Sequence, residues 1–113
     1  MSDQAPGKSA SPRLAEPAEL AGEWRIAGGV GGPCVVRLET AREEAANAHR
    51  LVDPAGCLGA LVGKPVAGWR PVPDGIELAG PDRLTALLFA YTGDAAVASG
   101  ADGRVLTLRR MGV

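Results

Sequence analysis

The chain has 113 residues, and 46% of them are hydrophobic, which is enough for one folded domain around a single core. Its 16 glycines and 9 prolines exceed average usage, so we expect many turns and short elements rather than long helices. The net charge of -1 argues against a polybasic surface for nucleic acid, and no apolar run is long enough for a membrane-spanning helix.

The first 16 residues differ in composition from the rest of the chain. Because they are mostly polar or proline and cannot build a core, we expect residues 1–16 to form a flexible arm and residues 17–113 to form the folded domain. Residues 17–22 predict one helical turn, with Pro17 at its first position and Gly22 at its end. The start of the chain has no apolar segment typical of a signal peptide, which leaves a periplasmic, secreted or cytoplasmic location open.

From residue 23 onward, short segments typical of β-strands alternate with turns that contain glycine, proline or aspartate. The connections are too short for crossover helices, so the sheet must be antiparallel. We expect an all-β fold in which about eight strands close into an up-and-down barrel of the lipocalin or streptavidin type, with a β-sandwich as the alternative. The expected strands cover residues 23–26, 34–40, 49–52, 66–72, 76–78, 84–91, 95–99 and 105–109.

Three stretches of this domain are less regular. Residues 41–46 carry alanines and glutamates and fit either a short helix or a wide turn. Residues 57–61 are typical of a helical turn laid across one end of a barrel. Residues 84–91 are apolar at both alternating positions, and we interpret them as a strand buried by its neighbours rather than as a short helix.

The chain offers few residues for catalysis. Its single histidine, His49, lies on an expected strand, where a packing or surface role is more common than a role as general base. No nucleophile motif or metal-binding pattern accompanies it, so we expect no enzyme activity, no cofactor and no metal site. Cys34 and Cys57 fit either one disulfide in an oxidising compartment or two buried free thiols, and their spacing does not decide between these.

Five segments, taken in chain order, resemble the alkaline proteinase inhibitor family of bacteria. Residues 20–24 contain a Leu-x-Gly-x-Trp signature as Leu20, Gly22 and Trp24. The segments that hold the two cysteines, a stretch around Trp69 and the end of the chain are also similar to that family. These further segments cover residues 34–38, 55–58, 68–78 and 102–110.

The resemblance implies an eight-stranded antiparallel barrel with a disulfide between Cys34 and Cys57. It also implies a periplasmic inhibitor of serralysin-type zinc proteases, and a related domain occurs in an outer-membrane lipoprotein. We expect Trp24 and Trp69 to belong to the core or the barrel end, and we expect the protein to be a monomer with the protease as its partner.

In the family that this chain resembles, the N-terminal arm enters the protease cleft and its terminal amine approaches the catalytic zinc. The matching residues here are Ser11, Pro12, Arg13 and Leu14, which we expect to contact the cleft. This chain departs from the pattern because residues 1–9 precede the position at which the family's mature chains begin. An amine at Met1 cannot occupy the same place unless the arm is trimmed or threads past the metal.

Two other functions stay open at this stage. A barrel could bind a small apolar ligand at its axis, or it could be an envelope-associated structural module without inhibitory activity. An eight-stranded barrel is just wide enough to be filled by side chains or to hold one small ligand, and we expect aliphatic side chains to fill it. The inward residues expected from strand alternation include Val36, Leu38, Ile76, Leu78, Leu106 and Leu108.

Overall fold

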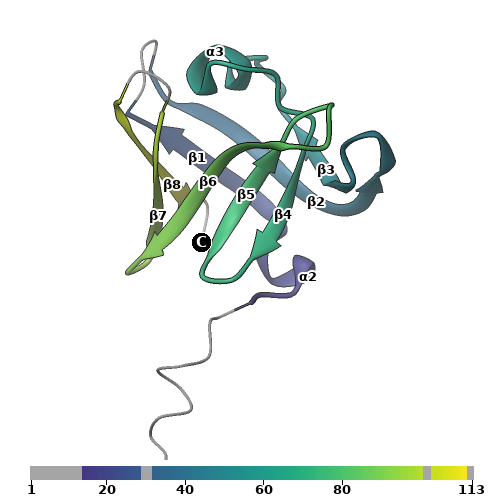
Figure 1. Ribbon diagram of the computed structural model, residues 1–113. Helices are drawn as coiled ribbons and strands as arrows, with labels where there is room; N and C mark the ends of the chain where they lie inside the picture. Colours follow the sequence, from purple (N-terminus) through teal and green to yellow (C-terminus); the bar gives the residue numbers. More distant parts are fainter. Residues whose placement is uncertain (1–13, 29–31, 101–102, 112–113) are drawn as a thin grey trace, which may run out of the picture.

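The computed structural model describes residues 14–28, 32–100 and 103–111. Eight antiparallel strands form a closed barrel in which each strand pairs with the next and β8 pairs back with β1 (Figure 1). This confirms the predicted up-and-down barrel and excludes the β-sandwich. The strands are β1 (Gly22–Ala27), β2 (Cys34–Glu43), β3 (Ala48–Val52), β4 (Gly68–Val72), β5 (Gly75–Ala79), β6 (Thr85–Thr92), β7 (Ala95–Ser99) and β8 (Val105–Arg110).

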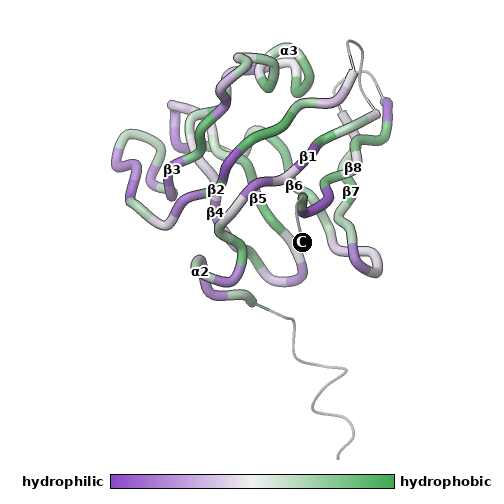
Figure 2. Tube along the Cα trace, turned by 180° about the vertical axis from the view of Figure 1, so that it is seen from behind, coloured by the Kyte–Doolittle hydropathy of each residue, from purple (hydrophilic) through white to green (hydrophobic). Residues whose placement is uncertain are grey.

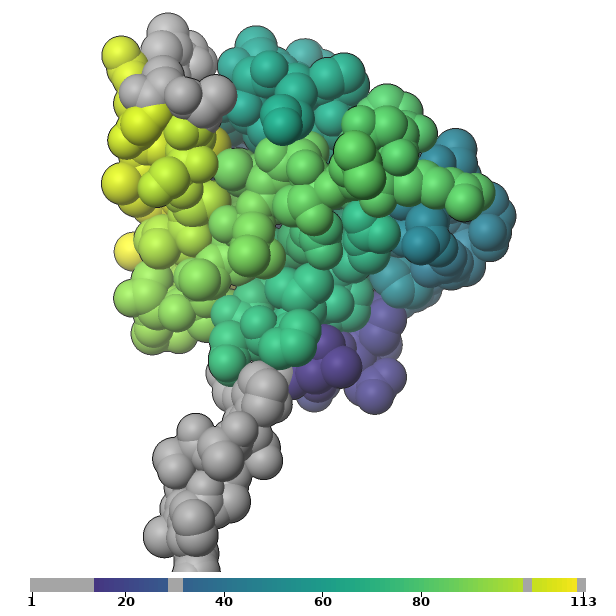
Figure 3. Space-filling view, viewed as in Figure 1, coloured from purple at the N-terminus to yellow at the C-terminus, as the bar shows by residue number. Residues whose placement is uncertain are grey.

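Two short helices lie at opposite ends of this barrel (Figures 1 and 3). Helix α2 (Pro17–Leu20) precedes β1 at one end, and α3 (Leu58–Val62) follows β3 at the other. A 3-10 turn, η1 (Glu44–Ala46), connects β2 to β3. None of the helices in the described ranges is long and apolar enough to cross a membrane.

The barrel interior is filled with aliphatic and aromatic side chains. Hydrophobic and hydrophilic residues alternate along the strands, as the tube in Figure 2 shows from behind. The six inward aliphatic residues predicted from this alternation are each at most 1% exposed, and they are Val36, Leu38, Ile76, Leu78, Leu106 and Leu108. Trp69 and Phe89 are fully buried beside them. These packed side chains occupy the axis where an apolar ligand would have to lie.

The helical turn before β1 is shorter than the sequence predicts. It ends at Leu20, Ala21 already has extended backbone angles, and Gly22 is the first residue of β1 rather than the helix end. Gly22 has a φ of +131°, so glycine is needed there for the chain to enter the strand.

The stretch predicted as a helix or wide turn after residue 40 divides into two parts. Ala41 to Glu43 continue β2, whose pairing with β3 shifts register between Leu38 and Arg42, and only Glu44–Ala46 form a 3-10 turn. Pairing with β3 therefore overrides the helix preference of alanine and glutamate here.

The interpretation of residues 84–91 as a strand is confirmed, but its burial on both faces is wrong. Leu87 and Phe89 point inward, whereas Leu84 is 66% and Leu88 is 53% exposed. The outer face of β6 has no covering element in the described residues, so its apolar side chains meet solvent. The outer faces of β1–β3 instead carry ion pairs such as Arg50 with Glu39, at 3.1 Å.

Candidate functional site

The end of the barrel that holds α2 is where the described chain begins, and we call it the arm end. It comprises residues 14–21 together with Trp24 on β1 and Arg110 on β8. Leu14 is 64% exposed, whereas Ala15 packs against the core. Of the four residues predicted to contact a protease, only Leu14 is described, because Ser11, Pro12 and Arg13 lie outside the described residues.

Local chemistry explains why α2 forms at the arm end. Pro17 stands at the start of the helix, where its fixed φ and missing N–H do no harm. Glu16 and Glu19 form a capping box, in which the Glu16 N–H donates to Glu19 Oε1 at 2.8 Å. Leu20 is buried and attaches this single turn to the core.

The C-terminal side of α2 is held by side chains from two neighbouring strands. Trp24 Nε1 donates to the Leu20 carbonyl at 2.8 Å. Arg110 donates from Nη1 to the Ala21 carbonyl at 2.9 Å and from Nη2 to the Glu19 carbonyl. The last carbonyls of a helix have no partner within it, so these three bonds satisfy groups that would otherwise need water.

A shallow pocket of about 160 Å³ opens at the arm end. Ala15, Leu20 and Trp24 line one side of it, and Tyr91 and the β6–β7 turn line the other. The exposed start of the described chain therefore lies beside a mostly apolar hollow, which offers a surface for a partner that approaches from this end.

The opposite end of the barrel holds α3, and we call it the disulfide end. A disulfide joins Cys34, the first residue of β2, to Cys57, which precedes α3. The Asp53 carboxylate accepts hydrogen bonds from the N–H groups of Cys57, at 3.2 Å, and Leu58, at 2.8 Å. The disulfide that the family resemblance implies is therefore confirmed, and it fixes α3 against the barrel.

The described residues hold one group of side chains close enough to share a metal ion, namely Cys34, Asp53 and Cys57. Both sulfurs of this group are bonded to each other, so they cannot act as thiolate ligands. His49 packs against Trp69, with ring centroids 5.3 Å apart, and its Nδ1 lies 3.0 Å from the Thr40 carbonyl. These contacts give the histidine a packing role rather than that of a general base.

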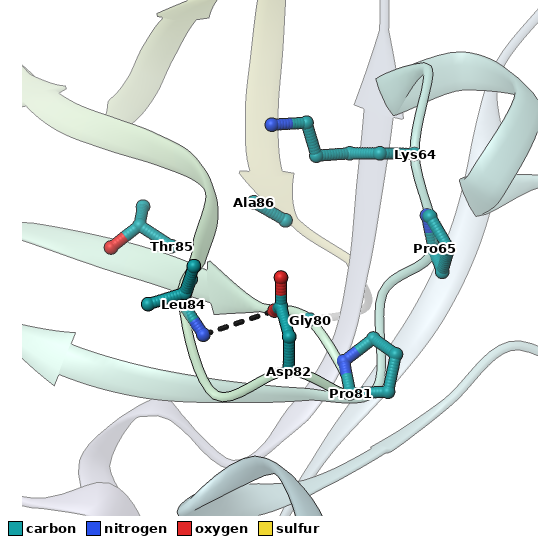
Figure 4. A pocket seen from close by; sticks show the side chains of 8 residues that line it. All are labelled: Lys64, Pro65, Gly80, Pro81, Asp82, Leu84, Thr85 and Ala86. Atoms are coloured by element: carbon teal, nitrogen blue, oxygen red, sulfur yellow. Dashed lines mark hydrogen bonds between the residues drawn. The ribbon is translucent and has the colours of Figure 1, made fainter.

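A larger hollow of about 340 Å³ lies near the disulfide end (Figure 4). Its lining comes from the segment after α3 and from the β5–β6 connection, and it includes Lys64, Pro65, Pro81 and Leu84. Asp82 Oδ1 accepts a hydrogen bond from the Leu84 N–H at 3.1 Å, and both residues line the hollow. The start of β6, at Thr85 and Ala86, completes the lining.

Comparison with known proteins identifies the family of this chain. The family described as "Protease inhibitor Inh" matches this sequence over residues 14–110. The chain belongs to this family. The match begins at Leu14, so the predicted contact residues Ser11, Pro12 and Arg13 lie outside it.

Two relatives and one solved structure agree with this assignment. A "Proteinase inhibitor" from Dickeya chrysanthemi is 32% identical over 102 residues, which cover 90% of this chain and 83% of that protein. An "Alkaline proteinase inhibitor" from Pseudomonas syringae pv. tomato is 36% identical over 68 residues, which cover 58% of this chain and 49% of that protein. The crystal structure of a psychrophilic marine protease MP inhibitor superposes with a TM-score of 0.70 and 26% identity over 86% of this chain and all of that chain.

These relatives are named as inhibitors of proteases and not as enzymes, which agrees with the absence of catalytic motifs in the sequence. The inhibitor family thus accounts for the barrel and for a protease as its partner. Sequence reasoning placed Trp24 at the core or the barrel end, and the structure buries it at the arm end, 6% exposed. It missed Arg110, because only the closure of β8 onto β1 brings that residue opposite Trp24.

Proposed function

We propose that this inhibitor acts on a secreted zinc metalloprotease of the serralysin type. In this proposal, residues 1–16 serve as the arm, Ser11, Pro12, Arg13 and Leu14 enter the active-site cleft, and residues 17–113 form the barrel that stays outside. The observation that carries the proposal is the exposed Leu14, which lies shortly before α2 in a chain of a protease inhibitor family. Helix α2 is itself hydrogen-bonded to the barrel. A segment that leaves a fixed base loses less conformational freedom on binding than one that leaves a loose end.

The chemistry of the cleft suits an arm of this kind. A catalytic zinc ion keeps one coordination position open for water, and a neutral amine is a suitable ligand for that position. An α-amino group has an ordinary pKa of about 7.7–8.0, so part of it is neutral near pH 7. A chain that starts at Ser11 would present such an amine, whereas a chain that starts at Met1 would block the cleft by its bulk.

We also propose that this inhibitor works in the periplasm or outside the cell. The disulfide between Cys34 and Cys57 supports this location, because disulfides persist in oxidising compartments and are rare in a reducing cytosol.

The test compares three chains that start at Met1, Ser11 and Leu14, each with the barrel and α2 unchanged. We expect the Leu14 chain to lose inhibition of a serralysin-type protease by about 100-fold or more, because the cleft contacts are removed. The Ser11 chain should inhibit most strongly if its amine ligates the zinc. Thermal unfolding serves as the control, since Glu16 and its capping box are present in all three chains.

Equal inhibition by the Leu14 chain and the full chain would exclude the arm mechanism. A full chain that inhibits proteases of other classes but no zinc protease would exclude the proposed target.

A further inference from the structure

The contacts at the arm end assign a specific task to Arg110. We infer that Arg110 is a positioning residue, which fixes the direction in which the chain leaves the barrel at Leu14 and so prepares the arm for the protease. This inference rests on the proposed function. Arg110 is far from α2 in sequence, since 91 positions separate it from Glu19.

Helix α2 cannot hold its own orientation. It has only four residues, and isolated helices of this length are unstable in water because nucleation costs more than a single turn returns. Arg110 binds the carbonyls of Glu19 and Ala21 from one guanidinium, while the Trp24 indole binds the intervening carbonyl of Leu20. Three successive carbonyls are thereby tied to β1 and β8, which fixes the axis of the turn.

The guanidinium that makes these bonds is itself held in place. Its central carbon lies 4.7 Å from the centroid of the Trp24 ring, a stacking arrangement that suits the planar cation. Arg110 also lies directly opposite Trp24 in the β1–β8 pairing, and the Met111 N–H continues this ladder by donating to the Glu23 carbonyl at 2.9 Å. The donor group is therefore placed by the sheet and not by α2.

Gly22 leaves the space that this arrangement requires. A Cβ atom at this position would lie 3.1 Å from Arg110 Nη1, so the guanidinium would have to shift by a few tenths of an ångström. All three residues of the Leu20, Gly22 and Trp24 motif thus take part: Leu20 offers a carbonyl, Gly22 gives room and Trp24 supplies a donor and a ring. Together with Arg110, these three residues hold α2, from which the arm extends, and we call this group of four residues the socket.

Two contacts connect this socket to the start of the described residues. The capping box links Glu16 to Glu19, and Ala15 packs against the core. A rotation of α2 would therefore change the direction in which the chain leaves the barrel at Leu14. Lysine cannot replace arginine here, since a single ammonium group does not provide two planar donors to two carbonyls while stacking on the indole.

The test uses full-length chains carrying Arg110→Ala or Arg110→Lys. Arg50→Ala is the matched control, because it also removes a strand arginine, and Arg50 forms an exposed ion pair with Glu39 at 3.1 Å on the outer face of the barrel. Two properties are measured, namely inhibition of a serralysin-type protease and the backbone ¹⁵N order parameters of Ala15, Glu16 and Glu19. The second readout reports the rigidity of the arm base whether or not a protease is bound.

We expect Arg110→Ala to lower the order parameters at Ala15 and Glu16 from about 0.85 toward 0.6 or below, while those of the β-strands stay unchanged. Inhibition should weaken about tenfold, the effect of losing one charge-assisted hydrogen bond or more. Arg110→Lys should fall between Arg110→Ala and the wild type in both readouts, and Arg50→Ala should match the wild type. If Arg110→Ala does not fold, Arg110→Lys decides the question.

Failure of this inference and failure of the proposed function give different results. Unchanged order parameters at Ala15 and Glu16 in the Arg110 variants, or a loosened base with undiminished inhibition, would overturn the positioning role. A wild-type chain that inhibits no zinc protease would overturn the proposed function, and the inference about the arm would fall with it even if Arg110 is found to hold α2.

Discussion

The two ends of the barrel hold their short helices in opposite ways. At the arm end, the C-terminal carbonyls of α2 accept hydrogen bonds from Trp24 and Arg110, and every described contact is non-covalent. At the disulfide end, the N–H groups at the start of α3 donate to Asp53, and Cys57 is bonded covalently to Cys34. The end groups of a short helix need partners outside the helix. Side-chain donors bind the carbonyls of α2, and a side-chain acceptor binds the N–H groups of α3.

The difference between covalent and non-covalent attachment suggests different roles for the two ends. The covalent bond at the disulfide end constrains the unfolded chain and so contributes to stability. The hydrogen bonds at the arm end fix a direction without closing a covalent loop, which suits the role that we propose for the arm. We propose that stability depends more on the disulfide end and inhibition more on the arm end.

Removing the disulfide should produce the largest change in stability. Replacing Cys34 and Cys57 with serine opens a link between positions 23 residues apart, and we expect a loss of about 3 kcal/mol of unfolding free energy. This corresponds to a fall in Tm of roughly 10 °C or more, measured by differential scanning calorimetry. Inhibition at a temperature where the variant is still folded should stay close to that of the wild type. Strong loss of inhibition by folded variant protein would contradict the division between the two ends.

Removing a single hydrogen bond at either end should have a smaller effect on stability. Trp24→Phe keeps an aromatic ring but removes the hydrogen bond to the Leu20 carbonyl, and Asp53→Ala removes the acceptor at the start of α3. Each should cost about 1 kcal/mol of stability, measured by urea unfolding. Only Trp24→Phe should also weaken inhibition, by a few-fold, because only this bond lies at the arm end. Equal weakening by both variants would show that inhibition follows general stability.

The barrel could be predicted from the sequence because its signals are local. Alternation in segments such as residues 34–38 and 105–109 fixes which side chains point inward, and glycine, proline and aspartate mark the turns. The predicted strands overlap all eight observed strands, although their ends differ by a few residues. Local signals failed where pairing decides the outcome, as at Ala41 to Glu43, which extend β2 despite their helix preference.

The site was harder to predict than the fold. The resemblance pointed to Ser11, Pro12, Arg13 and Leu14, but no local pattern gives a contact between the last strand and the turn before the first. Arg110 lies 89 residues from the Ala21 carbonyl that it binds, and only barrel closure brings the two together. An arginine at the end of the final strand could have been noted as a candidate once a closed barrel was expected.

Hydrogen–deuterium exchange of the full chain, with and without a serralysin-type protease, tests the central claim most directly. The account predicts slower exchange in peptides that cover residues 11–24 and the β6–β7 turn. It proposes that residues 11–14 enter the cleft, and residues 14–24 and the turn lie at the arm end. Peptides that cover residues 53–65 at the disulfide end should exchange at the same rate in both samples. Protection confined to residues 53–65, with the arm end unchanged, would contradict the account.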